Sequence, residues 1–133
     1  MFTVDVARDT GALLVALEHR YYGLSVPFGN ESLTIPNLEF LTVAQALADL
    51  SYFVDWFNKN SEYTSLRNGG KWVCVGGSYA GGLSSWLRET YPDVIHGSWA
   101  SSPVINAILE FTQFDYQIYL SANKSGPQCP AIV

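Results

Sequence analysis

A ten-residue segment in the middle of the chain combines an apolar strand, a tight glycine-flanked corner and the start of a helix. It reads Trp72-Val73-Cys74-Val75-Gly76-Gly77-Ser78-Tyr79-Ala80-Gly81. When a buried strand turns sharply into a helix, the side chain at the corner stands above the sheet edge, and the next backbone N–H groups point toward the same place. A serine held there is suited to attack an electrophile. We therefore predict that Ser78 is a nucleophile.

The residues around this serine are small, as a strained corner requires. Gly76 and Gly77 precede it, and Ala80 and Gly81 lie two and three residues after it. The usual pattern has glycine two residues after the nucleophile, and the alanine here adds only a methyl group. A glycine-rich corner also suits a bound phosphate, but the chain contains neither G-x-G-x-x-G nor G-x-x-x-x-G-K-[ST]. The nucleophile interpretation is therefore favoured.

Strand and helix patterns alternate along the rest of the chain. In order, we expect a strand at 12–17, a loop at 24–40, a helix at 42–57, the strand before Ser78, a helix at 79–91, a strand at 95–101, a helix at 104–120 and a final loop. The first helix carries a capping box, Thr42 with Gln45, and Pro92 stops the second. Such alternation is typical of an α/β fold, a parallel sheet flanked by helices.

The composition indicates a folded chain and limits its partners. Of the 133 residues, 48% are hydrophobic and 14% aromatic, which is well above the level of disordered chains. The net charge is −5, and the seven Lys and Arg residues form no basic patch, so we expect no nucleic-acid partner. No apolar run approaches the roughly 18 residues of a membrane span, and the first residues lack the apolar stretch of a signal peptide. Either the protein is cytosolic or its true beginning is missing.

A serine nucleophile needs a histidine base and a carboxylate that orients the histidine. His96 follows Asp93, but the intervening helix carries the chain nearly 20 Å from the active edge, so His96 enters its strand at the wrong end. His19 sits where a strand ends, and its neighbours Glu18 and Arg20 suggest an ion-paired structural corner instead. The chain therefore holds a nucleophile without a convincing base, and we expect it to be a piece of an enzyme.

Three motifs in order resemble one peptidase family. They are Glu18-His19-Arg20-Tyr21-Tyr22-Gly23-x-Ser25-x-Pro27-Phe28-Gly29, Leu41-Thr42-x-x-Gln45-Ala46-Leu47-Ala48-Asp49 and Gly76-Gly77-Ser78-Tyr79-Ala80-Gly81. Over roughly residues 7 to 129 the chain resembles the serine carboxypeptidase family that contains lysosomal Pro-X carboxypeptidase, dipeptidyl peptidase II and thymus-specific serine protease. The segments 72–75 and 99–104 look more like the thymus-specific branch.

The resemblance implies a partial α/β-hydrolase fold at residues 1–104 and the beginning of a helical cap at 105–133. It implies that Ser78 is acylated and that the Tyr79 backbone N–H is one oxyanion donor. The expected activity is a serine-type exopeptidase, a carboxypeptidase or dipeptidyl peptidase, that cuts peptides at proline or small residues. It also implies a lysosomal or extracellular full-length parent and is compatible with a homodimer of that parent. We expect no metal and no cofactor.

Some parts that the family uses have no match here. The resemblance places the catalytic Asp and His beyond this chain and gives Cys129 a disulfide partner that the chain lacks, whereas Cys74 reads as ordinary buried packing. Asn30 and Asn123 begin glycosylation triplets that matter only on the secretory route. Two other readings stay open: an esterase or lipase on the same fold, and a truncated, non-catalytic binding module.

Overall fold

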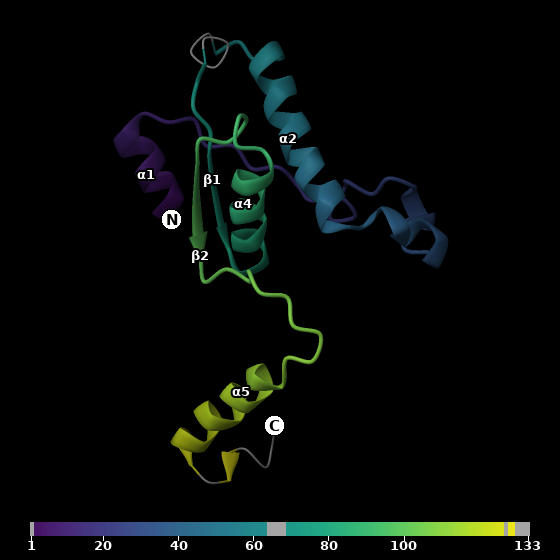
Figure 1. Ribbon diagram of the computed structural model, residues 1–133, viewed down its shortest axis with the longest axis vertical. Coiled ribbons are helices and arrows are strands. Elements are labelled where there is room, and N and C mark those ends of the chain that lie inside the picture. The colour runs from purple at the N-terminus through teal and green to yellow at the C-terminus, as the bar shows by residue number, and fades with distance from the viewer. Residues whose placement is uncertain (1, 64–68, 127, 130–133) are drawn as a thin grey trace.

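The computed structural model describes residues 2–63, 69–126 and 128–129 (Figure 1). Its elements, in chain order, are α1 (Phe2–Thr10), the 3₁₀ helices η1 (Gly29–Glu31) and η2 (Ile35–Phe40), α2 (Val43–Asn60), β1 (Val73–Gly77), α4 (Ser78–Thr90), β2 (Gly97–Ser101) and α5 (Thr112–Ser125).

The two strands form a parallel pair joined by a helix. Val73 is level with Gly97 at one end, and Gly77 is level with Ser101 at the other. Parallel neighbours need a crossover connection, and α4 supplies it, so β1, α4 and β2 make one strand–helix–strand unit (Figure 1). The predicted parallel arrangement and both of these strands are confirmed, and the chain contains an α/β unit.

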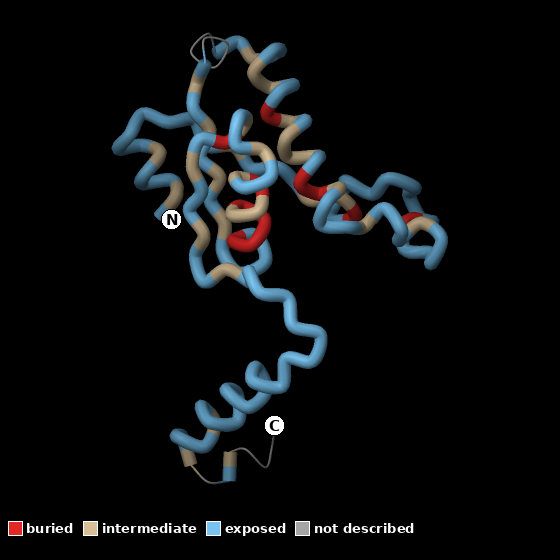
Figure 2. The backbone as a smooth tube through the Cα atoms, in the orientation of Figure 1, coloured by how far each residue is buried: buried red, intermediate tan, exposed pale blue. Residues whose placement is uncertain are grey.

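The core lies where α2 and α4 pack together beside the sheet (Figure 2). Its buried members are Ala46, Leu47 and Val54 of α2, Leu83 and Leu87 of α4, and Ile95 just before β2. A polar contact also joins the helix to the sheet. The fully buried Ser84 hydroxyl donates to the Gly81 carbonyl at 2.9 Å and lies 3.0 Å from the Ser98 hydroxyl of β2. The α4 helix is therefore fixed against one face of the strand pair.

The N-cap of α2 forms at Thr42 as predicted, but the Gln45 side chain pairs with the Thr42 hydroxyl and not with the Thr42 N–H as in a capping box. Thr42 is the N-cap residue in an extended conformation, and its hydroxyl accepts from the Gln45 N–H at 3.2 Å. The same hydroxyl contacts the Gln45 side-chain oxygen at 3.0 Å. This pairing satisfies one of the N–H groups that a helix start leaves without an internal partner. The helix runs three residues further than expected, to Asn60.

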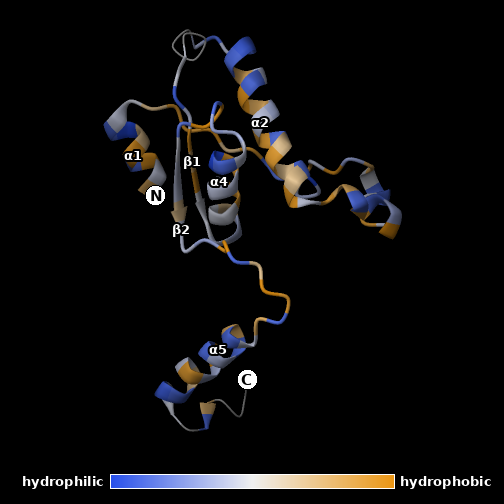
Figure 3. Ribbon diagram, viewed as in Figure 1, coloured by the Kyte–Doolittle hydropathy of each residue, from blue (hydrophilic) through white to orange (hydrophobic). Residues whose placement is uncertain are grey.

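The strand expected at 12–17 is wrong. Those residues follow α1 as irregular chain, coloured hydrophobic in Figure 3, and apart from the half-buried Val15 they are exposed. A strand is defined by hydrogen bonds to a neighbour, and none of the bonds described for this segment joins it to β1 or β2. The strand was predicted from hydrophobicity alone, and among the described residues no neighbouring strand pairs with this segment.

The C-terminal region also differs from expectation. Residues 102–111 are irregular, and α5 begins at Thr112, eight residues later than the helix expected at 104–120. The helix then continues to Ser125, through residues that were expected to be loop. It carries no buried residue and stands apart from the strand pair (Figure 1). Because no packing surface selects an apolar face here, the sequence pattern predicted that a helix forms but not where it begins and ends.

Candidate active site

Ser78 lies at the point where β1 passes directly into α4. It is the first residue of the helix, immediately after the last strand residue, and it is exposed. Its φ angle is +55°, a left-handed conformation that a residue with a side chain adopts only at a cost of order 1–2 kcal/mol. Ser102, directly after β2, also has a positive φ of 44°. Two strained serines therefore follow the carboxyl ends of neighbouring parallel strands, where sites form in α/β sheets.

The small residues around Ser78 are explained by close backbone contacts. A side-chain carbon added at Gly76 would lie 2.0 Å from the Ala80 carbonyl oxygen, so no larger residue fits there without a shift. A side-chain carbon at Gly81 would lie 3.1 Å from Pro103. Gly77 differs, because the nearest atom to such a carbon would be the Ser101 carbonyl oxygen at 3.8 Å. Of the two glycines before the serine, only Gly76 is required by space.

Tyr79 follows the serine in the first turn of α4. The first N–H groups of a helix have no carbonyl partner within it, so the Tyr79 N–H is free to face an anion. The peptide that joins Ser78 to Tyr79 is held from its other side, since the Val104 N–H donates to the Ser78 carbonyl at 3.2 Å. Burial, and secondarily the neighbouring Tyr22 hydroxyl, raise the pKa of the Tyr79 phenol.

His19 comes close to this corner, which sequence reasoning did not anticipate. Its Nε2 lies 3.1 Å from the Tyr79 hydroxyl, and its Nδ1 lies 2.7 Å from the Arg20 carbonyl oxygen. The two residues are 60 positions apart, so no local pattern could have paired them. The sequence suggested that His19 belongs to an ion-paired structural corner. Its neighbour Arg20 does form an ion pair, with Asp49.

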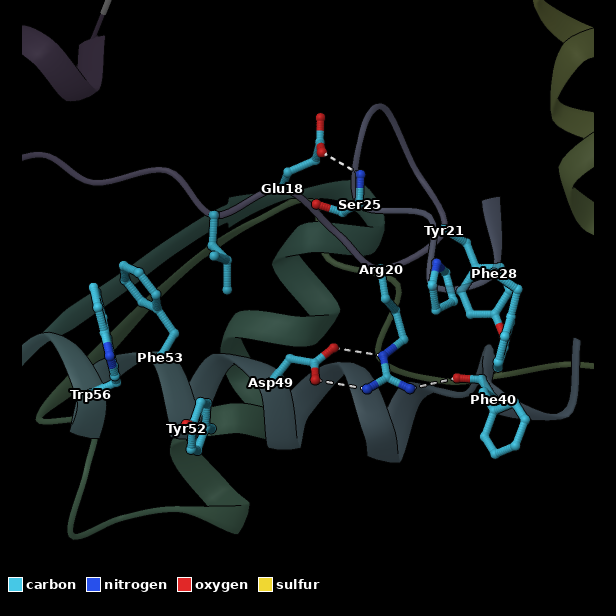
Figure 4. A pocket seen from close by; sticks show the side chains of 12 residues that line it. Glu18, Arg20, Tyr21, Ser25, Phe28, Phe40, Asp49, Tyr52, Phe53 and Trp56 are labelled. Carbon is cyan, nitrogen blue, oxygen red and sulfur yellow. Dashed lines mark hydrogen bonds and ion pairs between the residues drawn. The ribbon is translucent and has the colours of Figure 1, made fainter. Parts of the chain in front are cut away.

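The loop that carries His19 packs on α2 around a cavity of about 610 Å³ (Figure 4). Arg20 crosses it as a fork, with Nε 2.6 Å and Nη2 2.7 Å from the two Asp49 carboxylate oxygens and Nη1 2.6 Å from the Phe40 carbonyl. Aromatic side chains, among them Phe28, Tyr52 and Trp56, line the rest. Ser78 does not line this cavity, so the cavity does not mark the position of the reacting atoms.

His96 lies at the opposite end of the strand pair from Ser78, as predicted. Its N–H donates to the Trp72 carbonyl at 2.8 Å, one residue before β1 begins. The strand β1 advances four residues from Val73 to Gly77, and a strand rises about 3.3 Å per residue. His96 is therefore roughly 13 Å or more from the corner at Ser78. It cannot serve as the base for Ser78.

The remaining candidates are placed as follows. Cys74 and Cys129 are both unpaired thiols, and burial raises the pKa of Cys74, which fits its role as packing. Asn30, in η1, and Asn123, in α5, are exposed and so accessible to modification. In the described ranges no three His, Cys, Asp or Glu side chains gather as metal ligands would. No helix in those ranges is both long enough and apolar enough to cross a bilayer.

Comparison with known proteins places this chain in a family. The family model described as serine carboxypeptidase S28 matches residues 2–133. The chain belongs to the serine carboxypeptidase S28 family. It is 43% identical over 128 residues to the probable serine protease EDA2 of Arabidopsis thaliana, which covers 93% of this chain and 25% of that protein. The chain thus spans about a quarter of the length of that relative.

Two further S28 relatives represent the thymus-specific branch and the Pro-X carboxypeptidase branch of the family. The human thymus-specific serine protease is 41% identical over 105 residues, which is 79% of this chain and 20% of that protein. Mouse lysosomal Pro-X carboxypeptidase is 37% identical over 132 residues, 96% of this chain and 26% of that protein. The family resemblance drawn from the three motifs is confirmed, and both named members lie among the relatives of this S28 chain.

Proposed function

We propose that this S28 chain carries the nucleophile of a serine-type exopeptidase, a carboxypeptidase or dipeptidyl peptidase that acts on peptides at proline or small residues. The observation that supports this proposal most directly is the position of Ser78. It lies at the end of β1, is exposed and has a φ of +55°. Membership of a family described as serine carboxypeptidases supports peptide substrates. The names of two relatives, a thymus-specific serine protease and a Pro-X carboxypeptidase, support the same class.

The chemistry assigned to Ser78 is acyl transfer. The Ser78 Oγ attacks the scissile carbonyl, its proton passes to a histidine base, and the carbonyl oxygen becomes an oxyanion that accepts from the Tyr79 N–H. The amine then leaves with that proton, and water hydrolyses the acyl-serine. Neither His96, at the far end of the strands, nor His19, with both ring nitrogens engaged, suits the base. We assign the base and its carboxylate to a part of the full-length polypeptide outside residues 1–133.

The same proposal covers the larger organisation. We assign residues 1–104 to the core of an α/β hydrolase and residues 105–133 to the start of a helical cap, supported by the strand–helix–strand unit and by α5 standing apart from it. We propose a lysosomal or extracellular location for the full-length protein, and the name of the mouse relative supports the lysosomal one. Exposure of Asn30 and Asn123 supports their glycosylation there. A homodimer and the absence of a nucleic-acid partner stay predictions.

Labelling of the full-length protein with a fluorophosphonate probe tests the assignment. We expect one labelled residue, Ser78, and complete loss of labelling in Ser78→Ala, with a fall in kcat on the order of 10⁶-fold. Ser102→Ala is the matched control, because Ser102 is the second strained serine after a strand, and it should still be labelled. Labelling that persists in Ser78→Ala would refute the nucleophile. Hydrolysis of short esters without cleavage of proline-containing peptides would refute the peptidase and favour an esterase.

A further inference from the structure

The segment from Glu18 to Ser25 has no part in the acyl chemistry above, although it carries the longest of the three family motifs and reaches the nucleophile corner. The contact is the 3.1 Å approach of His19 Nε2 to the Tyr79 hydroxyl. The two rings are tilted by 57° with centroids 5.7 Å apart. The Tyr22 ring meets the His19 ring edge-on, with centroids 5.2 Å apart and an interplanar angle of 85°. The imidazole therefore contacts two tyrosines, one of which follows Ser78.

The hydrogen-bond partners of His19 fix which nitrogen carries the proton. The Arg20 carbonyl can only accept, so Nδ1, 2.7 Å away, must be the N–H donor. In the neutral ring Nε2 is then an acceptor, and the Tyr79 hydroxyl donates to it. Both nitrogens are engaged, which leaves neither to take a proton from Ser78. His19 acts on Tyr79 and not on the serine.

The loop that presents His19 is itself rigidly held. The Glu18 carboxylate accepts from the backbone N–H groups of Leu24 at 3.0 Å and Ser25 at 2.9 Å, which closes the loop on itself. This turn requires Gly23, which has a φ of +55° and where a side-chain carbon would lie 1.8 Å from the Glu18 carboxylate. The Arg20 fork then ties the loop to Asp49 on α2. The position of His19 is thus set by two anchors around it, the Glu18 carboxylate and the Arg20–Asp49 pair.

The peptide between Ser78 and Tyr79 is the group on which this loop can act. Because a trans peptide is planar, its C=O and N–H point in opposite directions, and fixing one fixes the other. The Val104 N–H holds the Ser78 carbonyl at 3.2 Å. The Tyr79 Cα belongs to the same planar unit, and the side chain that it carries is tethered at its hydroxyl by His19. Two contacts from distant segments therefore determine where the Tyr79 N–H points.

We propose that His19 is a positioning residue which, through the Tyr79 hydroxyl, holds the Tyr79 N–H in the direction that the oxyanion requires. The proposal rests on the proposed function of Ser78. A misplaced oxyanion donor weakens the transition state more than the bound substrate, so the effect belongs in kcat and not in KM. The 18–25 loop is on this account a clamp on the catalytic corner, and its strained turn and ion pair serve to keep that clamp in place.

The test uses the full-length protein and hydrolysis of p-nitrophenyl acetate, an activated ester that an acylating serine accepts without peptide specificity. We expect His19→Leu and Tyr79→Phe each to lower kcat about tenfold with KM changed less than about twofold. The double variant should be no slower than either single one, since both remove the same contact. His19→Gln places an amide acceptor near the position of Nε2 and should retain at least about half of the wild-type kcat.

The chain offers matched controls for both substitutions. His96→Leu removes the other histidine, at the far end of the strands, and Tyr91→Phe removes a hydroxyl at the opposite end of α4; both should leave kcat unchanged. Unchanged kcat in Tyr79→Phe, or losses that multiply in the double variant, would overturn the clamp. The clamp would also be overturned if His19→Gln lost as much kcat as His19→Leu and unfolded at a lower temperature than the wild type. That result would indicate a purely structural role for His19. If Ser78→Ala still takes up the fluorophosphonate, the nucleophile assignment itself fails.

Discussion

At the scale of single residues, the positive φ of Ser78 is the most informative feature, because strain of this kind persists only where the surroundings enforce it. Gly76 provides part of that enforcement by letting the Ala80 carbonyl approach the end of β1. The sequence motif was sufficient to predict that Ser78 lies at a strand–helix corner between the small residues Gly76 and Ala80, since their relationship is local. It could not predict the contact of His19 with Tyr79, because only tertiary folding brings those two side chains together.

The two glycines before the serine provide a prediction with an internal control. In Gly76→Ala the new methyl carbon meets the Ala80 carbonyl oxygen at 2.0 Å, so we expect a loss of about 3 kcal/mol in the free energy of unfolding and loss of labelling at Ser78. Gly77→Ala meets nothing closer than 3.8 Å and has an extended backbone, so its change should stay within about 1 kcal/mol. Urea unfolding of the full-length protein measures both. Equal stability of the two variants would contradict this account of the corner.

At the scale of elements, prediction succeeded where a pattern carried its own boundary signal. The Thr42 cap fixed the start of α2, and Pro92 lies just beyond the end of α4. The apolar run at 12–17 has no such signal for pairing, and it proved irregular because a strand exists only through a neighbour. The same physics explains the late start of α5, which has no buried residue whose packing would select its limits.

The connection between the 18–25 loop and α2 is testable as a unit. Arg20 makes a two-bond fork to Asp49 plus a bond to the Phe40 carbonyl, a geometry that lysine cannot reproduce. We expect Arg20→Lys to lower the free energy of unfolding by about 1–2 kcal/mol. Arg8→Lys is the control, since Arg8 makes one 3.2 Å contact to Asp5 at a well-exposed site and should change stability by less than about 0.5 kcal/mol. Equal effects in thermal unfolding would mean that the fork does not anchor the loop.

At the scale of the whole molecule, the surface is larger than a closed fold of this mass allows. A compact monomer of 14.7 kDa has about 6,900 Å² of accessible surface, whereas this chain exposes 9921 Å². Part of the excess is the sheet face turned away from α4, where Val73, Val75 and Trp99 are exposed, although the Phe2 ring of α1 lies edge-on to Trp99 with centroids 5.0 Å apart. The described part of the sheet also has two strands, each with an open edge. Such a surface favours association.

The 133-residue chain expressed by itself should therefore self-associate and bind the dye ANS, because its open sheet face offers apolar surface to a second copy or to the dye. Val75→Lys places a charge in the middle of that face and should reduce the associated fraction at equal concentration, measured by sedimentation velocity. Leu24→Lys makes the same kind of change at a 94% exposed loop position away from the strands, so it should leave association unchanged. A monomeric chain without dye binding would show that the open face is satisfied within the chain itself. Each lysine adds one positive charge to a chain of formal charge −5. If both variants changed association equally, the cause would therefore be the net charge of the chain and not the open sheet face.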